Sequence, residues 1–213
     1  MPDLKKTLRF YFITDDHAPA CSPTEQVKIA IHAGATIVQY RNKSFSSQFL
    51  GEVTAIRTLC KSNGVPLIIN DNILLAKQVM ADGVHLGQED EHPEIARNVL
   101  GSEAIIGTSV SSLDELEKTD LRHCDYIGTG AVFPTCTKEG KNVCGLSGLE
   151  TVAKNSSVPV VAIGGIDSTN AKSCFEHGAA GIAVITFISR ADDLLRNALE
   201  LGSACGCDPR PSV

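Results

Sequence analysis

The sequence predicts a single-domain (β/α)8 (TIM) barrel, and three observations lead to this fold class. Short apolar runs rich in β-branched residues alternate with longer segments of helical periodicity along the chain. Eight such runs can be counted, which is the strand number of this barrel. The chain has 213 residues, at the short end of the range for the fold. A doubly wound open sheet is the alternative, but the GxGxxG pattern of a dinucleotide fold does not follow the first strand.

The first half of the chain contains four strand and helix pairs. Helix ends are marked by glycine, which readily adopts the left-handed conformation that follows the last turn. Examples are Gly34, Gly64 and Gly101. We expect strands at 8–14, 36–40, 67–69 and 83–86, with helices at 24–33, 46–62, 73–80 and 93–100.

The second half repeats the pattern but contains one long connection, 129–147. Loops between a strand and a helix usually have about 2 to 6 residues, and longer ones are commonly functional. We expect strands at 104–107, 125–128, 160–163 and 181–185, with helices at 113–119, 168–177 and 191–201. The core of the domain then spans about 8–201, and 202–213 is expected to be a frayed tail. Its Cys205 and Cys207 could bind a metal, although a tail without function is favoured.

Composition excludes several classes of protein. Hydrophobic residues make up 43% and charged residues 21% of the chain, as in soluble globular proteins. A net charge of -6 argues against nucleic acid as a partner, whereas a small phosphorylated ligand needs local cations only. The 8 cysteines are scattered without a CxxC pair, so we expect reduced thiols and a cytoplasmic protein. We expect neither export nor membrane insertion, because no long apolar run is present.

Polar residues follow nearly every predicted strand, at the end of the barrel where active sites of this fold lie. Each group has a structural alternative: the cations could be solvated loop charges, and the acidic residues could begin helices. Together, however, two carboxylates facing cations would repel a phosphate unless a divalent cation lay between them. The combination therefore implies Mg²⁺, one ion per site. The groups are Gln39–Lys43, Asn70–Asp71, Gly87–Asp90, Thr108–Ser109, Pro134–Lys138, Gly164–Gly165 and Ile185–Thr186.

Other chemistry is disfavoured. Gly164–Gly165 could bind a phosphate through backbone N–H groups, or it could be a turn that needs glycine. The six histidines show no HExxH spacing, so a zinc site is not expected. His85 is interpreted as a packed histidine. A GxSxG hydrolase motif is absent from the sequence.

Several segments resemble the thiamine phosphate synthase family, and they are spread from about residue 10 to residue 189. They are YFITDD, QYRNK, INDN, ADGVHLGQED, IIGTSV, DYIGTGAVFPTCTK, VPVVAIGGI and GIAVIT. The resemblance implies a transferase of thiamine biosynthesis that joins an aminopyrimidine methyl diphosphate to a thiazole ethyl phosphate, or to its carboxylated form. Pyrophosphate leaves with the help of Mg²⁺. The partners would be small phosphorylated substrates, and a homodimer stays open.

The resemblance also implies roles for the residues at the strand ends. The metal ligands would be Asp71 and Asp90, and the catalytic residues Arg41, Lys43, Ser109 and Lys138. The pyrimidine diphosphate would be bound by Gln39, Tyr40, Arg41, Asn42, Lys43, Asn70, Ser109 and Lys138. The thiazole phosphate would be bound by Thr135, Cys136, Thr137, Gly165, Ile185 and Thr186. The sequence departs from the family pattern at Tyr40, Asn42, Ala131, Cys136 and Thr186.

The chemistry fits these residues. A thiazole nitrogen has a free lone pair and no proton to lose, so the reaction needs no general base, and stabilisation of the departing pyrophosphate is the main task. We expect a dissociative mechanism. Two alternatives stay open: a thiazole phosphate tautomerase or regulatory relative without transferase activity, and a phosphate-binding barrel without catalysis. By resemblance, the first relative would lack both metal carboxylates and would have a histidine near the position of Ser111.

Overall fold

The computed structural model describes residues 3–19, 21–135 and 143–211. Eight parallel strands form a closed barrel in sequence order, and β1 pairs with β8 to close it. This confirms the predicted barrel and excludes the open sheet. The strands are β1 (Phe10–Ile13), β2 (Ile37–Tyr40), β3 (Leu67–Asn70), β4 (Gly83–Leu86), β5 (Ile105–Ser109), β6 (Tyr126–Thr129), β7 (Val160–Ile163) and β8 (Gly181–Val184).

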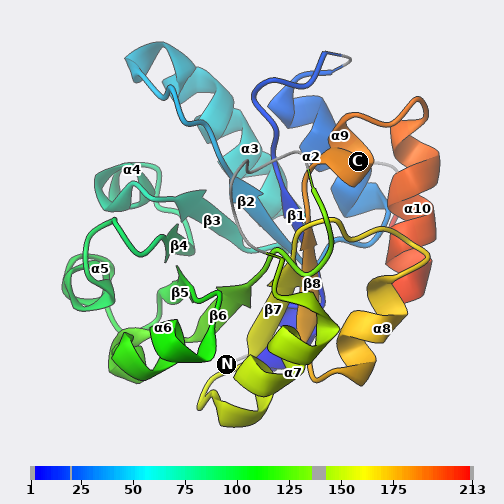
Figure 1. Ribbon diagram of the computed structural model, residues 1–213. Helices are drawn as coiled ribbons and strands as arrows, with labels where there is room; N and C mark the ends of the chain where they lie inside the picture. The colour runs from blue at the N-terminus through cyan, green and yellow to red at the C-terminus, as the bar shows by residue number, and fades with distance from the viewer. Residues whose placement is uncertain (1–2, 20, 136–142, 212–213) are drawn as a thin grey trace.

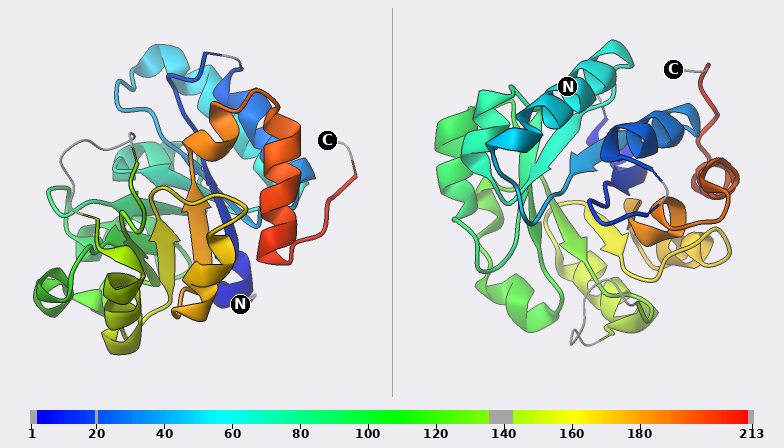
Figure 2. Two further views of the ribbon diagram at one scale, coloured as in Figure 1. Left: turned by 45° about the vertical axis from the view of Figure 1, so that its right-hand side comes forward. Right: turned by 90° about the horizontal axis from the view of Figure 1, so that it is seen from above.

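Helices surround the strands on the outside of the barrel (Figure 1, Figure 2). The long ones follow the strands in turn: α2 (Pro23–His32), α3 (Leu50–Ser62), α4 (Ile73–Gln78), α5 (Pro93–Leu100), α6 (Leu113–Lys118), α7 (Gly145–Asn155), α8 (Ala171–Glu176) and α10 (Leu194–Cys205). The short elements are α1 (Leu4–Thr7), α9 (Thr186–Ser189) and the 3-10 helices η1 (Ser47–Phe49) and η2 (Leu121–His123).

Local sequence explains where α2 begins and ends. The Ser22 hydroxyl accepts a hydrogen bond from the Glu25 N–H, and the Glu25 carboxylate accepts one from the Ser22 N–H, which makes a capping box. Pro23 then supplies a φ that suits the first turn. Gly34 follows the helix with φ +95°, a conformation that glycine adopts without steric cost.

The core has two parts because successive side chains of a strand point to opposite faces. Inward-facing side chains fill the barrel: Leu8, Tyr11, Ile13, Ile37, Ile68, Tyr126, Val161 and Ala183. The outward-facing ones pack against the helices in a larger cluster. Gly107 makes room inside the barrel, since a Cβ there would lie 2.1 Å from Cζ of Tyr126.

Some boundaries differ from the expectations. The short helices α1 and α9 were not predicted, and the segment expected to be one helix over 46–62 is divided into η1 and α3. Helix α7 was not predicted either, and it begins at Gly145, inside the connection expected over 129–147. Short helices of this kind are set by the packing around them more than by their own periodicity.

The expected frayed tail is not observed from residue 202 to residue 211. Helix α10 continues to Cys205, which is buried, and the following residues turn back along it (Figure 2). The Arg210 N–H donates to the His32 carbonyl at 2.8 Å, and its guanidinium donates to the Asn63 carbonyl at 3.1 Å. These contacts attach the tail to the ends of α2 and α3.

Two general expectations can be compared with the described residues. No helix among them is long and apolar enough to cross a bilayer. All seven cysteines in this part of the chain are unpaired in the structure.

Candidate active site

Two adjoining cavities open at the carboxyl end of the barrel. The first, here the charged cavity, has a volume of about 460 Å³ and is lined by Arg41, Lys43, Asn70, Asp71 and Asp90, among others. The second, here the glycine cavity, has a volume of about 570 Å³ and is lined by Thr135, Gly164, Gly165, Thr186 and Phe187, among others. Both are bordered by Ser109, Gly128, Ile163, Ala183 and Ile185, so the two spaces meet above the barrel interior.

The loop after β2 contributes alternate residues to the charged cavity. Gln39, Arg41 and Lys43 line it. The Arg41 backbone is held by the buried Thr14, whose hydroxyl accepts from the Arg41 N–H at 2.9 Å. Among the described residues, the Arg41 guanidinium forms no ion pair, so its charge is available to a ligand.

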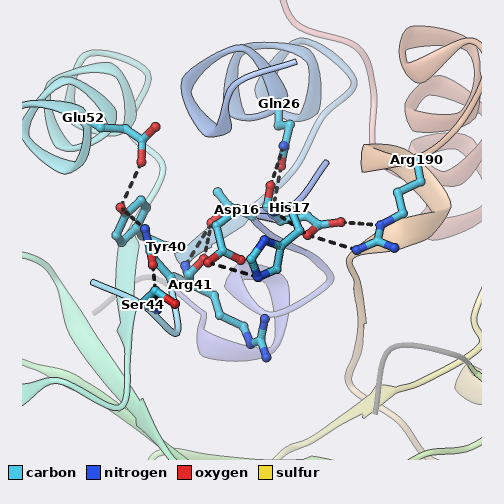
Figure 3. Close-up of polar contacts among 11 residues, drawn as sticks. Asp16, His17, Gln26, Tyr40, Arg41, Ser44, Glu52 and Arg190 are labelled. Atoms are coloured by element: carbon cyan, nitrogen blue, oxygen red, sulfur yellow. Dashed lines mark hydrogen bonds and ion pairs between the residues drawn. The ribbon is translucent and has the colours of Figure 1, made fainter. Parts of the chain in front are cut away.

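Tyr40 is buried on the other face of β2. Its hydroxyl donates to Oε1 of Glu52 in α3 at 2.9 Å, so its side chain extends toward α3 (Figure 3). The Arg41 side chain extends away from α3 and lines the charged cavity. Asn42 is bound within its own loop, where its Oδ1 accepts from the Ser44 N–H at 2.9 Å. Neither Tyr40 nor Asn42 lines either cavity, so the structure does not bring these two predicted residues into the site.

Asp71 follows β3 in an unusual backbone conformation, with φ +62°. Non-glycine residues rarely adopt this region, and such outliers are commonly found at functional sites. Its Oδ2 lies 2.5 Å from Nζ of Lys43. The N-cap of α4 is Asn72, so the alternative in which Asp71 caps that helix is wrong.

Asp90 closes the turn after β4. Its Oδ2 accepts a hydrogen bond from the Gly87 N–H at 2.6 Å. His92, not Asp90, is the N-cap of α5, so Asp90 does not begin that helix either. Its carboxyl group lies close enough to that of Asp71 for the two to influence each other's pKa.

The pKa values of the two carboxyl groups are shifted in opposite directions. Burial raises the pKa of Asp71, but the hydrogen bond from Lys43 and the interaction with Asp90 outweigh burial and hold it below its usual range. The pKa of Asp90 is raised by burial and by the Asp71 charge, against the lowering effect of the Gly87 N–H. Two carboxylates that share one site in this way create a region of concentrated negative potential.

The glycine cavity is built around two backbone positions that glycine alone satisfies easily. Gly164 and Gly165 have φ values of +98° and +65°. A Cβ on Gly165 would lie 2.5 Å from the Pro134 carbonyl oxygen, so the glycine also permits close approach of the loop after β6. The Asn170 side chain donates to the Gly165 carbonyl at 3.0 Å and fixes this turn.

The family of the chain follows from comparison with known proteins. Residues 10–188 match the family described as thiamine monophosphate synthase. The chain belongs to this family. It is 41% identical to a thiamine-phosphate synthase of Persephonella marina over 192 residues, which are 89% of this chain and 92% of that protein. A thiamine-phosphate synthase of Natronomonas pharaonis is 42% identical, with 86% of this chain and 88% of that protein covered.

A solved structure of the thiamine monophosphate synthase family agrees with the fold. The thiamine phosphate pyrophosphorylase of Pyrococcus furiosus superposes with a TM-score of 0.86 at 35% identity, covering 96% of this chain and 98% of that one. An orotidine 5'-phosphate decarboxylase of Pyrococcus horikoshii has a TM-score of 0.66 at 15% identity, a likeness of fold alone.

Most residues assigned from the resemblance to the thiamine monophosphate synthase family lie where the two cavities are. The charged cavity contains Gln39, Arg41, Lys43, Asn70, Asp71, Asp90 and Ser109, and the glycine cavity contains Thr135, Gly165, Ile185 and Thr186. Cys136, Thr137 and Lys138 lie outside the described residues.

Sequence reasoning missed several residues of the charged cavity. His85 does not simply pack inside the barrel: its Nε2 lies 3.1 Å from Oγ of Ser109, and it lines the cavity. Tyr11, Tyr126 and Glu115 also line it. Strand alternation contained the signal for His85, since His85 and Ser109 both lie near the end of a strand on its inward face.

An ion pair between the buried Asp15 and the half-exposed Arg190 connects the loop after β1 to the end of α9. The Asp15 carboxylate is 4% exposed, and its Oδ2 accepts from Nε of Arg190 at 2.7 Å and from Oγ of Ser189 at 3.1 Å. The backbone of Asp15 is bound by the Gln26 side chain of α2, at 2.9 Å and 2.8 Å (Figure 3). The helix that begins at Thr186 is therefore fixed to both β1 and α2.

The donor set fits Mg²⁺. Among the described residues, no group of three or more His, Cys, Asp or Glu side chains is arranged to hold a metal alone. Mg²⁺ commonly uses only one or two carboxylates and takes further oxygens from substrate phosphates and water. The Asp71 and Asp90 pair beside Arg41 and Lys43 suits that mode of binding.

Proposed function

We propose that this chain joins an aminopyrimidine methyl diphosphate to a thiazole ethyl phosphate and releases thiamine phosphate and pyrophosphate; with the carboxylated form of the thiazole, carbon dioxide is released as well. The observation that supports this most strongly is the contact between the charged and glycine cavities at Ser109 and Gly128. A reaction between two phosphorylated molecules needs two anion sites at a short separation, since much of its barrier is overcome by holding both reactants in place.

The charged cavity suits the diphosphate. Arg41 offers a planar fork of donors and Lys43 a compact positive charge, and both are suited to phosphate oxygens. Gln39, Asn70 and Ser109 offer polar groups near the barrel interior for the pyrimidine ring. Lys138 is proposed to act with them.

The glycine cavity suits the thiazole phosphate. Gly165 exposes backbone near Thr135, and Ile185 and Thr186 begin α9 at the opposite wall. Cys136 and Thr137 are proposed to bind the thiazole phosphate as well. Apolar neighbours such as Ile166 and Phe187 leave an environment in which an uncharged thiazole ring is favoured over water.

The chemistry requires a carbon–oxygen bond to break and a carbon–nitrogen bond to form. The thiazole nitrogen supplies the electron pair of the new bond, and the electron pair of the broken bond leaves with pyrophosphate. Arg41 and Lys43 stabilise the negative charge on the leaving group, which is a preorganised electrostatic role. The electron-rich aminopyrimidine stabilises positive charge on its methylene carbon, so we propose that departure precedes attack.

Asp71 and Asp90 are the residues that would hold one Mg²⁺. When bound, the ion would neutralise charge on the diphosphate and so make it a better leaving group. Arg41 and Lys43 line the same cavity from the loop after β2, so they would still bind the diphosphate beside the ion.

Two observations disfavour the alternative without transferase activity. Both carboxylates are present in one cavity, and Ser111, not histidine, lines the glycine cavity. We further propose that the protein acts in the cytoplasm on free small molecules and not on nucleic acid. Size-exclusion chromatography tests whether it does so as a homodimer.

The decisive experiment mixes the purified chain with both substrates and Mg²⁺ and detects thiamine phosphate by mass spectrometry. Each substrate alone is the control. Product that forms only with both substrates supports the transferase. Tautomerisation of the thiazole phosphate without condensation would support the tautomerase relative, and binding of both substrates without turnover would support a binding protein.

A further inference from the structure

A chain of four hydrogen bonds crosses the barrel interior from Gln39 to Ser109. Nε2 of Gln39 lies 2.9 Å from the Tyr11 hydroxyl, which lies 2.8 Å from the Tyr126 hydroxyl. The Tyr126 hydroxyl lies 3.1 Å from Nδ1 of His85, and Nε2 of His85 lies 3.1 Å from Oγ of Ser109. The five residues come from five different strands, so the chain exists only in the closed barrel.

The central residues of this hydrogen-bond chain are buried and tightly packed. Tyr11 and Tyr126 are each 1% exposed, and Gln39 is 2% exposed. The ring of Tyr126 lies between those of Tyr11 and His85, with centroid distances of 5.9 Å and 5.5 Å. Buried hydroxyls that lose their partners are costly, so these contacts are strongly maintained.

The donors along the chain can be assigned from its first member. The Gln39 amide nitrogen can only donate, so the Tyr11 oxygen accepts from it and the Tyr11 proton is directed to Tyr126. The Tyr126 proton is then directed to Nδ1 of His85. Burial raises the pKa of both phenols, which keeps both protons in place.

The end of the chain follows from the same reasoning. A neutral imidazole has one N–H, so His85 with an accepting Nδ1 carries its proton on Nε2 and donates it to Ser109. The Ser109 oxygen is thereby used as an acceptor within the protein. Its own proton remains to be donated into the charged cavity, which Ser109 lines.

We propose that Tyr11, Tyr126 and His85 are positioning residues that orient the Ser109 hydroxyl as a hydrogen-bond donor, so that the site selects an aromatic ring with an accepting nitrogen at that point. The proposal rests on the proposed function for its substrate class. An aminopyrimidine has two accepting ring nitrogens and one amino donor. The site should therefore distinguish the ring-nitrogen edge from a ring edge that carries C–H.

The direct test is the tautomer of His85, which needs no turnover. Nitrogen-15 NMR of the ligand-free protein at pH 8, above the ordinary pKa of histidine, distinguishes the two neutral tautomers. The signal is assigned by its loss in His85→Gln. We expect the proton on Nε2 in the wild type and a mixture of tautomers in Tyr126→Phe, which removes the donor to Nδ1. A wild-type proton on Nδ1 would overturn the proposal.

Tyr40→Phe is the matched control. Tyr40 is equally buried, but its hydroxyl donates to Glu52 outside the barrel. The Tyr40→Phe substitution removes one buried hydroxyl that is not part of the hydrogen-bond chain, so His85 should keep its proton on Nε2. A change of tautomer in this variant equal to that in Tyr126→Phe would show that any loss of packing moves the proton.

Selectivity is the second readout. Two diphosphate analogues, each with one ring nitrogen replaced by C–H, are compared with the natural pyrimidine. The wild type should lose about tenfold in kcat/KM with one of them, the worth of one hydrogen bond. That ratio should fall toward one in Ser109→Ala, Tyr126→Phe and Tyr11→Phe, but not in Tyr40→Phe. The proposal would be overturned if folded Tyr11→Phe and Tyr126→Phe proteins kept the wild-type ratio of kcat/KM values. If His85 has the expected tautomer but the protein does not join the two substrates, only the proposed function is contradicted.

Discussion

Lys43 and Asp71 form an ion pair across the charged cavity, with Nζ and Oδ2 2.5 Å apart. The two residues come from neighbouring strands, and the proposed function gives them different partners, the diphosphate for Lys43 and the metal for Asp71. Each neutralises the other in the ligand-free protein. Under the proposed function, a bound metal diphosphate would compete with this ion pair for both residues, which would lower the net gain from either contact alone.

Arg41→Ala should weaken binding of the pyrimidine diphosphate. The substitution removes a charge-assisted contact of about 1.5 to 3 kcal/mol, which corresponds to about 10- to 150-fold in kcat/KM. Steady-state kinetics with each substrate varied in turn measures the effect. The loss should appear with the pyrimidine diphosphate, and binding of the thiazole phosphate alone should be unchanged.

Arg122→Ala is the control for Arg41→Ala. Arg122 is exposed and pairs with Asp120, and it lines neither cavity. Its loss should leave both substrates unaffected. A defect confined to the thiazole phosphate in Arg41→Ala would show that the two cavities have been assigned to the wrong substrates.

Gly165→Ala should impair the thiazole phosphate site. The new Cβ would lie 2.5 Å from the Pro134 carbonyl oxygen and would displace the loop that carries Thr135. A displacement of about 1 Å can cost about a hundredfold in rate, so we expect KM for the thiazole phosphate to rise at least about tenfold. Titration with this substrate measures it.

Gly64→Ala separates backbone strain from steric conflict. Gly64 has φ +63°, close to the +65° of Gly165, but no atom lies within 4 Å of its Cβ position. Both variants should lose about 1 kcal/mol of stability from the left-handed conformation. If the two variants show the same KM for the thiazole phosphate, contact with the loop after β6 does not matter.

The barrel was predictable because its strands are buried runs separated by helix signals, each readable locally. The facing of individual side chains was less accessible. Tyr40 and Arg41 are adjacent in the segment QYRNK, for which the resemblance implied binding of the pyrimidine diphosphate. The Tyr40 side chain nevertheless bonds Glu52, whereas Arg41 lines the charged cavity. The packed interpretation of His85 was incomplete: its ring packs against Tyr126, but it also bonds Ser109 and lines the charged cavity, and these partners come from other strands.

The short helix α9 and the tail could not be found from sequence for a related reason. Four residues from Thr186 have too little periodicity to predict a helix. The contact of Arg190 with Asp15 spans 175 positions of sequence. Arg210 attaches the tail to backbone carbonyls. Because every residue has a backbone carbonyl, the sequence does not indicate which of them Arg210 will contact.

Asp15→Asn should destabilise the protein above about pH 4, and the effect should decline as the pH falls from there through the lower pKa of the folded protein. Burial raises the pKa of Asp15, but Arg190, the His17 N–H and Ser189 outweigh burial and hold the pKa below its usual value. The unfolded chain therefore binds the proton more tightly. This stabilisation is present above the pKa of an unfolded aspartate, about 3.9, and is lost as the pH falls through the lower folded value.

Urea unfolding at pH 7 and pH 3 measures this dependence. At pH 7 we expect a loss of about 1 to 3 kcal/mol in the free energy of unfolding for Asp15→Asn, the worth of hydrogen bonds to a charged group. The difference from wild type should shrink at pH 3. A difference that stays constant between the two pH values would mean that the charge of Asp15 does not stabilise the fold.

Asp71→Asn and Asp90→Asn should remain folded and lose most of their activity. Neither residue is a helix N-cap, and asparagine tolerates the left-handed conformation of Asp71 well. The Asp90→Asn side chain keeps an oxygen that can accept from the Gly87 N–H. What both substitutions remove is the anionic charge that Mg²⁺ prefers in its ligands. Melting temperatures near that of wild type with strongly reduced kcat are the expected result.

Because the diphosphate also ligates the metal, higher Mg²⁺ should partly rescue each single variant and rescue the double variant least. EDTA should abolish wild-type activity until Mg²⁺ is restored, and full activity in EDTA or in the double variant would rule out Asp71 and Asp90 as the metal ligands.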